Sequence, residues 1–120
     1  MTRSVEIAPG VWMPMLGLGT FRAKGENVKA AVRCALSCGY GHIDTASVYK
    51  NEEDLATVLA QHREGGGKVF ITSKISPFEM GQERATSALD GIRRRLRVDC
   101  IDLVLIHWPG AAKIPPDSPQ

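Results

Sequence analysis

The sequence predicts an α/β protein built on a parallel sheet. Between residues 15 and 107, segments with a helical apolar repeat alternate with short apolar runs typical of buried strands. The connections are short, and alternation with short connections favours parallel strands joined by right-handed crossovers. Both an open doubly wound sheet and part of a closed barrel fit this order.

The chain opens with a predicted hairpin over residues 5–14, in which a Pro-Gly pair supplies the turn between two short apolar arms. Residues 15–20 form a short apolar strand that contains two glycines. A helix is expected from about residue 26 to residue 38, with Gly39 at its C-cap, where a residue tolerant of positive φ is favoured. Its core-facing apolar stripe comprises Val28, Ala31, Val32, Ala35 and Leu36.

The second strand, residues 40–44, follows at once and leads through a polar loop to a second helix. Asn51 is a suitable N-cap for that helix, and the acidic residues at 52–54 favour its positive end. The predicted buried residues of the helix are Leu55, Val58 and Leu59. Three consecutive glycines end it before a third strand over residues 68–73.

A third helix is expected from about residue 82 to residue 97, and a fourth strand over residues 101–107. The helix stripe comprises Ala85, Leu89, Ile92 and Leu96, and the strand is almost continuously apolar, as expected for burial on both faces. Four arginines near the helix end predict a solvated face rather than a nucleic-acid patch. Residues 109–120 hold four of the seven prolines, so we expect a domain over 1–108 and then an irregular proline-rich tail.

The composition is that of an ordinary globular domain, with 120 residues, 43% hydrophobic and 23% charged. A net charge of +2 argues against nucleic-acid and membrane-surface partners, and no apolar run reaches the roughly 20 residues of a membrane helix. The N-terminus has no signal-peptide pattern, so a cytoplasmic protein is expected. Three cysteines argue against a disulfide framework; Cys34 and Cys38 have ligand-like spacing, but no second pair completes a zinc site, so packing is predicted.

Four chemically active side chains fall at or just beyond the C-terminal ends of successive predicted strands. They are Asp44 at the end of the second strand, Tyr49 in the following loop, Lys74 after the third strand and His107 after the fourth. Because the ends of parallel strands meet at one edge, the four are expected around one mouth. Each alone has an ordinary structural explanation, whereas four together at one edge indicate a site.

These side chains suit a reaction that develops negative charge on an oxygen and then protonates it. The ammonium of Lys74 would favour the phenolate form of Tyr49, and Asp44 would hold the lysine charged and in place. His107 would position a substrate oxygen or share its proton. Reduction of a carbonyl by hydride is such a reaction, and the hydride must come from a cofactor because no side chain carries one.

Two other sites fit less well. The Gly-Leu-Gly run at 17–19 and the acid Asp44 match part of a dinucleotide fingerprint, but Arg22 stands where the third glycine belongs. His42 and Asp44 share a strand face and suggest a metal site, yet Lys74 at the same mouth would repel a cation. No metal is therefore expected.

Residues 13–21, 39–52, 71–74 and 102–109 carry motifs whose order is specific to one family. Through them the chain resembles the N-terminal half of an aldo-keto reductase, a family of NADPH-dependent TIM-barrel oxidoreductases. The resemblance implies a (β/α)8 barrel fold, of which this chain supplies the N-terminal hairpin and about the first four β/α units. It departs from the family pattern at Gly41, where an arginine is usual, and at Ala56, where a glycine is usual.

The resemblance also implies roles for individual residues. The catalytic tetrad would be Asp44, Tyr49, Lys74 and His107, with Tyr49 as general acid. The NADPH-binding residues would be Gly19, Thr20, Phe21 and Asp44. The residues around an aldehyde or ketone substrate would be Phe21, Tyr49, His107 and Trp108.

A (β/α)8 barrel takes about 250 residues and eight strands. The chain is therefore expected to be a truncated form that lacks much of the cofactor site and is inactive by itself. The alternative is a non-catalytic interaction module that self-associates through open sheet edges. Neither the particular carbonyl substrate nor a preference for NADPH over NADH follows from the sequence.

Overall fold

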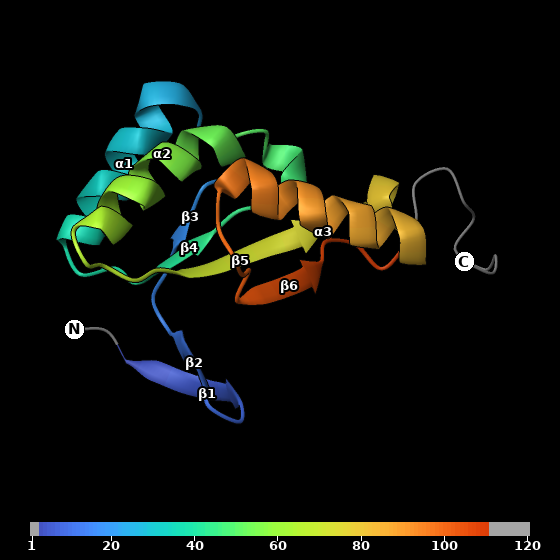
Figure 1. Cartoon of the computed structure of the whole chain (residues 1–120), viewed down its shortest axis with the longest axis horizontal. Coiled ribbons are helices and arrows are strands. Elements are labelled where there is room, and N and C mark those ends of the chain that lie inside the picture. Colours follow the sequence, from blue (N-terminus) through green and yellow to red (C-terminus); the bar gives the residue numbers. More distant parts are fainter. Residues whose placement is uncertain (1–2, 111–120) are drawn as a thin grey trace.

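The structure is a computed structural model that describes residues 3–110. Its strands are β1 (Ser4–Ala8), β2 (Val11–Pro14), β3 (Leu18–Gly19), β4 (His42–Asp44), β5 (Phe70–Ile75) and β6 (Leu103–Ile106). Its helices are α1 (Gly25–Ser37), α2 (Glu52–Glu64) and α3 (Gln82–Leu96), with the short 3-10 helices η1 (Ser47–Tyr49) and η2 (Pro77–Glu79). Strands β3 to β6 pair in chain order as one parallel sheet, and the three α-helices lie over one face of it (Figure 1). The predicted α/β class and parallel sheet are confirmed.

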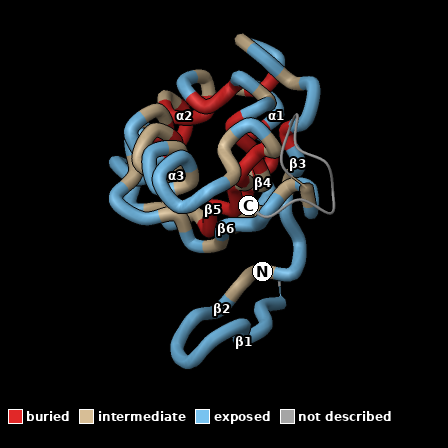
Figure 2. Tube along the Cα trace, turned by 90° about the vertical axis from the view of Figure 1, so that its right-hand side faces the viewer, coloured by how far each residue is buried: buried red, intermediate tan, exposed pale blue. Residues whose placement is uncertain are grey.

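The first two strands form the predicted antiparallel hairpin. At its turn, Gly10 has a φ of +76°, a conformation that residues with a side chain rarely adopt. The hairpin extends away from the sheet, and nearly all of it is exposed (Figure 2).

The core lies between the sheet and its three helices, and Figure 2 shows it as the buried interior of the chain above the hairpin. Its buried cluster comprises Val28, Val32, Ile43, Leu55, Val58, Leu59, Ile71, Ile92 and Leu96. The prediction was wrong for Ala31, which is exposed, because only the narrower stripe of Val28, Val32 and Ala35 on α1 is buried. Gly39, just beyond α1, has a φ of +94°, as its predicted capping role requires.

Strands β3, β4 and β6 are shorter than predicted, and β5 is shifted toward the C-terminus. β3 has only two residues, and β5 runs on to Ile75, so Lys74 lies inside a strand rather than after it. The fourth strand is not buried on both faces, since Val104, Leu105 and Ile106 are 38%, 41% and 64% exposed. Within the described residues β6 has a neighbour only on its β5 side, so its side chains are covered less than those of β5.

Two surface predictions also need correction. Cys34 and Cys38, for which packing was predicted, are exposed, as is Cys100. The arginines at the end of α3 do not form one solvated face, because Arg95 reaches across to the buried carboxylate of Glu52 at 2.7 Å. Residues 111–120 of the predicted tail lie outside the described residues, and the boundary at residue 108 stays a prediction. No helix among residues 3–110 is long and apolar enough to cross a bilayer.

Candidate active site

The four predicted catalytic residues meet at the C-terminal edge of the sheet. Asp44 is the last residue of β4, Lys74 lies near the end of β5, and His107 follows β6 directly. Tyr49 ends η1, the short helix between β4 and α2. The parallel register brings these strand ends together, as the sequence predicts.

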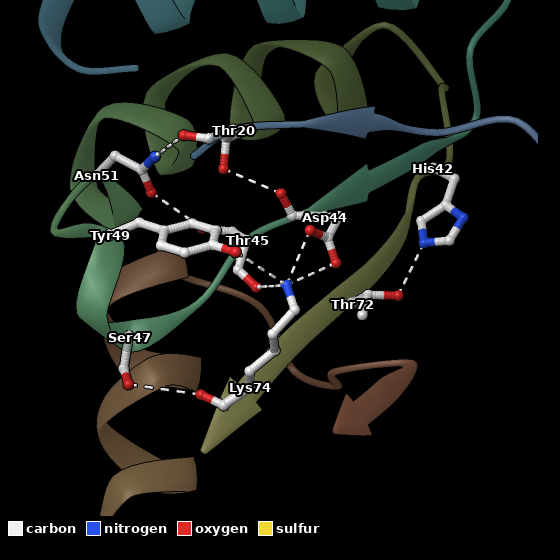
Figure 3. A network of polar contacts seen from close by, with 9 residues as sticks. All are labelled: Thr20, His42, Asp44, Thr45, Ser47, Tyr49, Asn51, Thr72 and Lys74. Atoms are coloured by element: carbon white, nitrogen blue, oxygen red, sulfur yellow. Dashed lines mark hydrogen bonds and ion pairs between the residues drawn. The ribbon is translucent and has the colours of Figure 1, made fainter. Parts of the chain in front are cut away.

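The ammonium of Lys74 is the centre of the site (Figure 3). Its Nζ donates to both carboxylate oxygens of Asp44 at 2.7 and 2.8 Å and to the backbone carbonyl of Thr45 at 2.9 Å. It also lies 3.4 Å from the hydroxyl oxygen of Tyr49. The Lys74 side chain is only 12% exposed, whereas that of Asp44 is 35% exposed. A largely buried ammonium therefore stands between a carboxylate and a phenol hydroxyl.

Other aromatic rings lie beside the Tyr49 ring. The ring centroids of Phe21 and His107 lie 5.3 and 5.8 Å from that of Tyr49, and His107 stacks on Trp108 at 5.5 Å. Phe21 and Trp108 are 64% and 58% exposed, so the mouth has apolar walls that face solvent. Nδ1 of His107 is buried and has no hydrogen-bond partner within residues 3–110, which leaves one polar edge of the imidazole uncommitted.

The segment predicted to bind the cofactor runs beside β4. Gly19 pairs with Asp44 in the sheet and is exposed. Thr20 is buried, and both its backbone N–H and its hydroxyl donate to the Asp44 carbonyl, at 3.1 and 2.9 Å. The Thr20 hydroxyl is thus already engaged within the protein. Gly19 and Phe21 are the members of this segment that present surface at the mouth.

Several residues that support the site were missed by the sequence analysis. The hydroxyl of Ser47, on η1, donates to Oε1 of Glu79 at 2.6 Å, and the same oxygen accepts the backbone N–H of Ser76 at 2.9 Å. These bonds tie the segment that carries Tyr49 to η2. Asn51 was expected to cap α2; it holds the N-cap position, but its side chain makes no capping bond.

Two carboxyl groups beside η1 have opposite pKa shifts. Burial raises the pKa of Glu52 above its ordinary value, although the hydrogen bond and charge of Arg95 oppose that effect. Burial acts in the same direction on Glu79, but hydrogen bonds from Ser47 and Ser76 outweigh it, so the pKa of Glu79 is lowered overall. Glu52 also has one buried oxygen, Oε2, with no partner among the described residues.

The metal-site alternative gains no support from His42. Its Nδ1 lies 3.0 Å from the Pro14 carbonyl and its Nε2 lies 2.7 Å from the Thr72 hydroxyl, so both ring nitrogens are committed. Among residues 3–110 no three His, Cys, Asp or Glu side chains are grouped as metal ligands would be.

Comparisons with known proteins identify the family. The model of the Aldo/keto reductase family matches residues 15–114. The chain is 39% identical over 111 residues to glyoxal reductase of Bacillus subtilis, covering 92% of this chain and 40% of the relative. It is also 39% identical over 105 residues to morphine 6-dehydrogenase of Pseudomonas putida, covering 88% of this chain and 36% of the relative.

Solved structures of aldo-keto reductases agree with this family assignment. The fold superimposes on Bombyx mori aldo-keto reductase in complex with NADP with a TM-score of 0.85 and 35% identity, covering 99% of this chain and 42% of that chain. The aldose reductase of Schistosoma japonicum gives a TM-score of 0.83 at 35% identity, covering 90% and 37% of the two chains.

The chain thus spans about 40% of the length of the curated relatives it matches. These relatives have (β/α)8-barrel folds, and the described residues correspond to a hairpin and four parallel strands of such a barrel, without closing it. With the family model matched over residues 15–114, the chain belongs to the aldo/keto reductase family.

Proposed function

We propose that the protein to which these residues belong reduces small aldehydes or ketones with NADPH, and that Tyr49 is the general acid. The contact that carries the proposal is the Lys74 ammonium, 3.4 Å from the Tyr49 hydroxyl and within 2.8 Å of both Asp44 oxygens. Solved relatives bound to NADP or NADPH support the choice of cofactor.

Each side chain has a role in this proposal. Tyr49 donates its proton to the carbonyl oxygen as negative charge develops there, and Lys74 stabilises the phenolate that remains. Asp44 pairs with the Lys74 ammonium and fixes its direction. His107, in edge contact with the Tyr49 ring, orients the carbonyl oxygen toward the phenol.

The cofactor and substrate would occupy the mouth. NADPH supplies the hydride when it is bound. The exposed surfaces of Gly19 and Phe21 and the partly exposed Asp44 carboxylate fit a ligand that lies along the ends of β3 and β4. Thr20 would act through its backbone, because its hydroxyl is engaged. Phe21 and Trp108 would form the apolar walls of the substrate site together with Tyr49 and His107.

The test uses the complete protein that carries these residues. Its turnover is followed by NADPH oxidation with glyoxal and with an aromatic aldehyde as substrates. Tyr49→Phe removes only the hydroxyl, and turnover should fall by about 10²–10⁴-fold, the usual contribution of general acid catalysis. Thr86→Ala, on the exposed face of α3, is the control and should leave turnover unchanged. Full activity of the phenylalanine variant would refute the role of Tyr49.

We further infer that residues 1–120 do not bind NADPH by themselves. The described sheet ends at β3 and β6 and leaves the apolar residues of β6 exposed, so the walls of a closed barrel are lacking. Fluorescence titration of the isolated polypeptide with NADPH should show no saturable binding. Micromolar affinity would contradict this inference.

The second candidate function is an interaction module, favoured by the same exposed β6. Its side chains at 104–106 and its free edge would suit pairing with a further strand. Size-exclusion chromatography with light scattering of residues 1–120 decides the matter. A monomer with a cooperative thermal melt argues against pairing through the edge, and a stable dimer supports it.

A further inference from the structure

The side chain of Asn51 is a buried bridge between two segments of the site (Figure 3). It is 1% exposed. Its Nδ2 donates to the backbone carbonyls of Thr20 at 2.9 Å and Ala23 at 3.0 Å, and its Oδ1 accepts the Thr45 hydroxyl at 2.9 Å. Both amide protons and the amide oxygen are therefore used, as a buried amide requires.

The partners of this amide belong to the two segments that carry Phe21 and Tyr49. Thr20 directly precedes Phe21, on the side where the cofactor is proposed to lie. Thr45 begins the segment that leads to Tyr49, and its carbonyl accepts from the Lys74 ammonium at 2.9 Å. One amide thus connects the Phe21 side of the site to the side that carries the acid.

The chain between Tyr49 and Asn51 is strained. Lys50 has a φ of +57°, in the left-handed region that residues other than glycine and asparagine rarely occupy. Such a conformation persists where the surrounding contacts hold it in place. The three bonds of Asn51, the next residue, are contacts of this kind, and across this turn the Phe21 and Tyr49 ring centroids lie 5.3 Å apart.

We propose that Asn51 is a positioning residue, which holds the Phe21 segment and the Tyr49 segment at the spacing that carbonyl reduction needs. The catalytic part of this proposal rests on the proposed function; the spacing itself does not. A capping role would have used the Asn51 side chain locally, at the start of α2. Its Nδ2 hydrogen bonds instead reach carbonyls 28 and 31 residues earlier in the chain.

Asn51→Asp is the informative substitution. It keeps the size of the side chain and the oxygen that accepts from Thr45, but it places a carboxylate oxygen against the Thr20 and Ala23 carbonyls in place of the N–H donors. The first measurement needs no activity: it records nuclear Overhauser contacts between the Phe21 and Tyr49 rings in the complete protein, labelled at phenylalanine and tyrosine. The second is the kcat and KM of the complete protein.

We expect the ring contact to weaken or disappear and kcat to fall about 10–100-fold, because small misplacements of reacting groups have effects of that size. Ile92→Val is the control for stability alone, since Ile92 is fully buried in the core on α3. It should keep the ring contact and kcat.

The proposal is overturned if the folded Asn51→Asp variant keeps the ring contact and keeps kcat within about twofold of the wild type. It is also overturned if Ile92→Val and Asn51→Asp lose the same unfolding free energy and show the same loss of ring contact and of kcat. If Asn51→Asp does not fold, Thr45→Val removes one of the three bonds with an isosteric side chain. Weaker ring contacts in that variant support the proposal, and unchanged ones refute it. If the wild-type protein lacks reductase activity, the proposed function fails, while the ring contacts still decide whether Asn51 sets the spacing.

Discussion

Replacement of Lys74 by methionine tests the centre of the site. The substitution keeps the aliphatic stem and removes an ammonium that contacts both Asp44 oxygens, the Thr45 carbonyl and the Tyr49 hydroxyl. The Asp44 carboxylate then faces an apolar side chain. Breaking a fully buried ion pair costs about 3–5 kcal/mol, because a charge is left without its partner.

The cost here should be smaller, because the Asp44 side chain is 35% exposed and water can reach it. We therefore expect the free energy of unfolding to fall by about 1–3 kcal/mol, the range for a charged hydrogen-bonding group that loses its partner. Turnover should fall by at least about 10²-fold, because the phenolate of Tyr49 would lose its stabilising cation.

The assay combines urea unfolding and NADPH-dependent turnover of the complete protein. Lys29→Met is the matched control: Lys29 pairs with the exposed Glu26 of α1 at 3.6 Å and should change stability by less than about 0.5 kcal/mol. Equal unfolding free energies and equal turnover for the two variants would refute the account of Lys74 given above.

Four further predictions concern stability. The raised pKa of Glu52 means that the folded protein binds this proton more tightly than the unfolded chain does. Stability that is present below pH 4.5 is therefore lost as the pH rises through the folded pKa of Glu52. Glu52→Gln should remove that loss in a series of thermal melts across pH. The pKa of Glu79 is shifted in the opposite direction, so its contribution to stability is lost on acidification below pH 4.5, and Glu79→Gln should remove that loss. Identical pH profiles for the Glu52 and Glu79 variants would contradict these two assignments. Ile43→Ala, at a fully buried position of β4, should lower the unfolding free energy by about 2–5 kcal/mol in urea, and a change below about 1 kcal/mol would show that the site is not packed as described. Gly39→Ala should destabilise by about 1 kcal/mol because of its positive φ, whereas Gly65→Ala, at a φ of −80°, should not.

Local patterns were enough to locate most of the elements. The apolar repeat of α2, with Leu55, Val58 and Leu59 on its buried face, and the acids at its start are properties of one short segment. A local pattern also predicted the hairpin correctly, because its turn residues are neighbours in the sequence. It fails for β6, since an apolar run shows that a strand prefers burial, while the actual exposure of Ile106 depends on which elements lie beside it.

The sequence by itself determined which side chains gather at the strand ends: an acid, a phenol, an amine and an imidazole come to one edge of a parallel sheet, whatever the details of packing. Only the tertiary structure decided how that edge is held together. Asn51 looked like a helix cap because capping preference depends on residue type and local position, but its partners are a carbonyl 31 residues earlier and a hydroxyl on the preceding loop. Glu52 was expected only to favour the positive end of α2, and the structure also buries it against Arg95, 43 residues away. Hydrogen bonds between distant segments depend on how those segments pack, and no local pattern of residues encodes that.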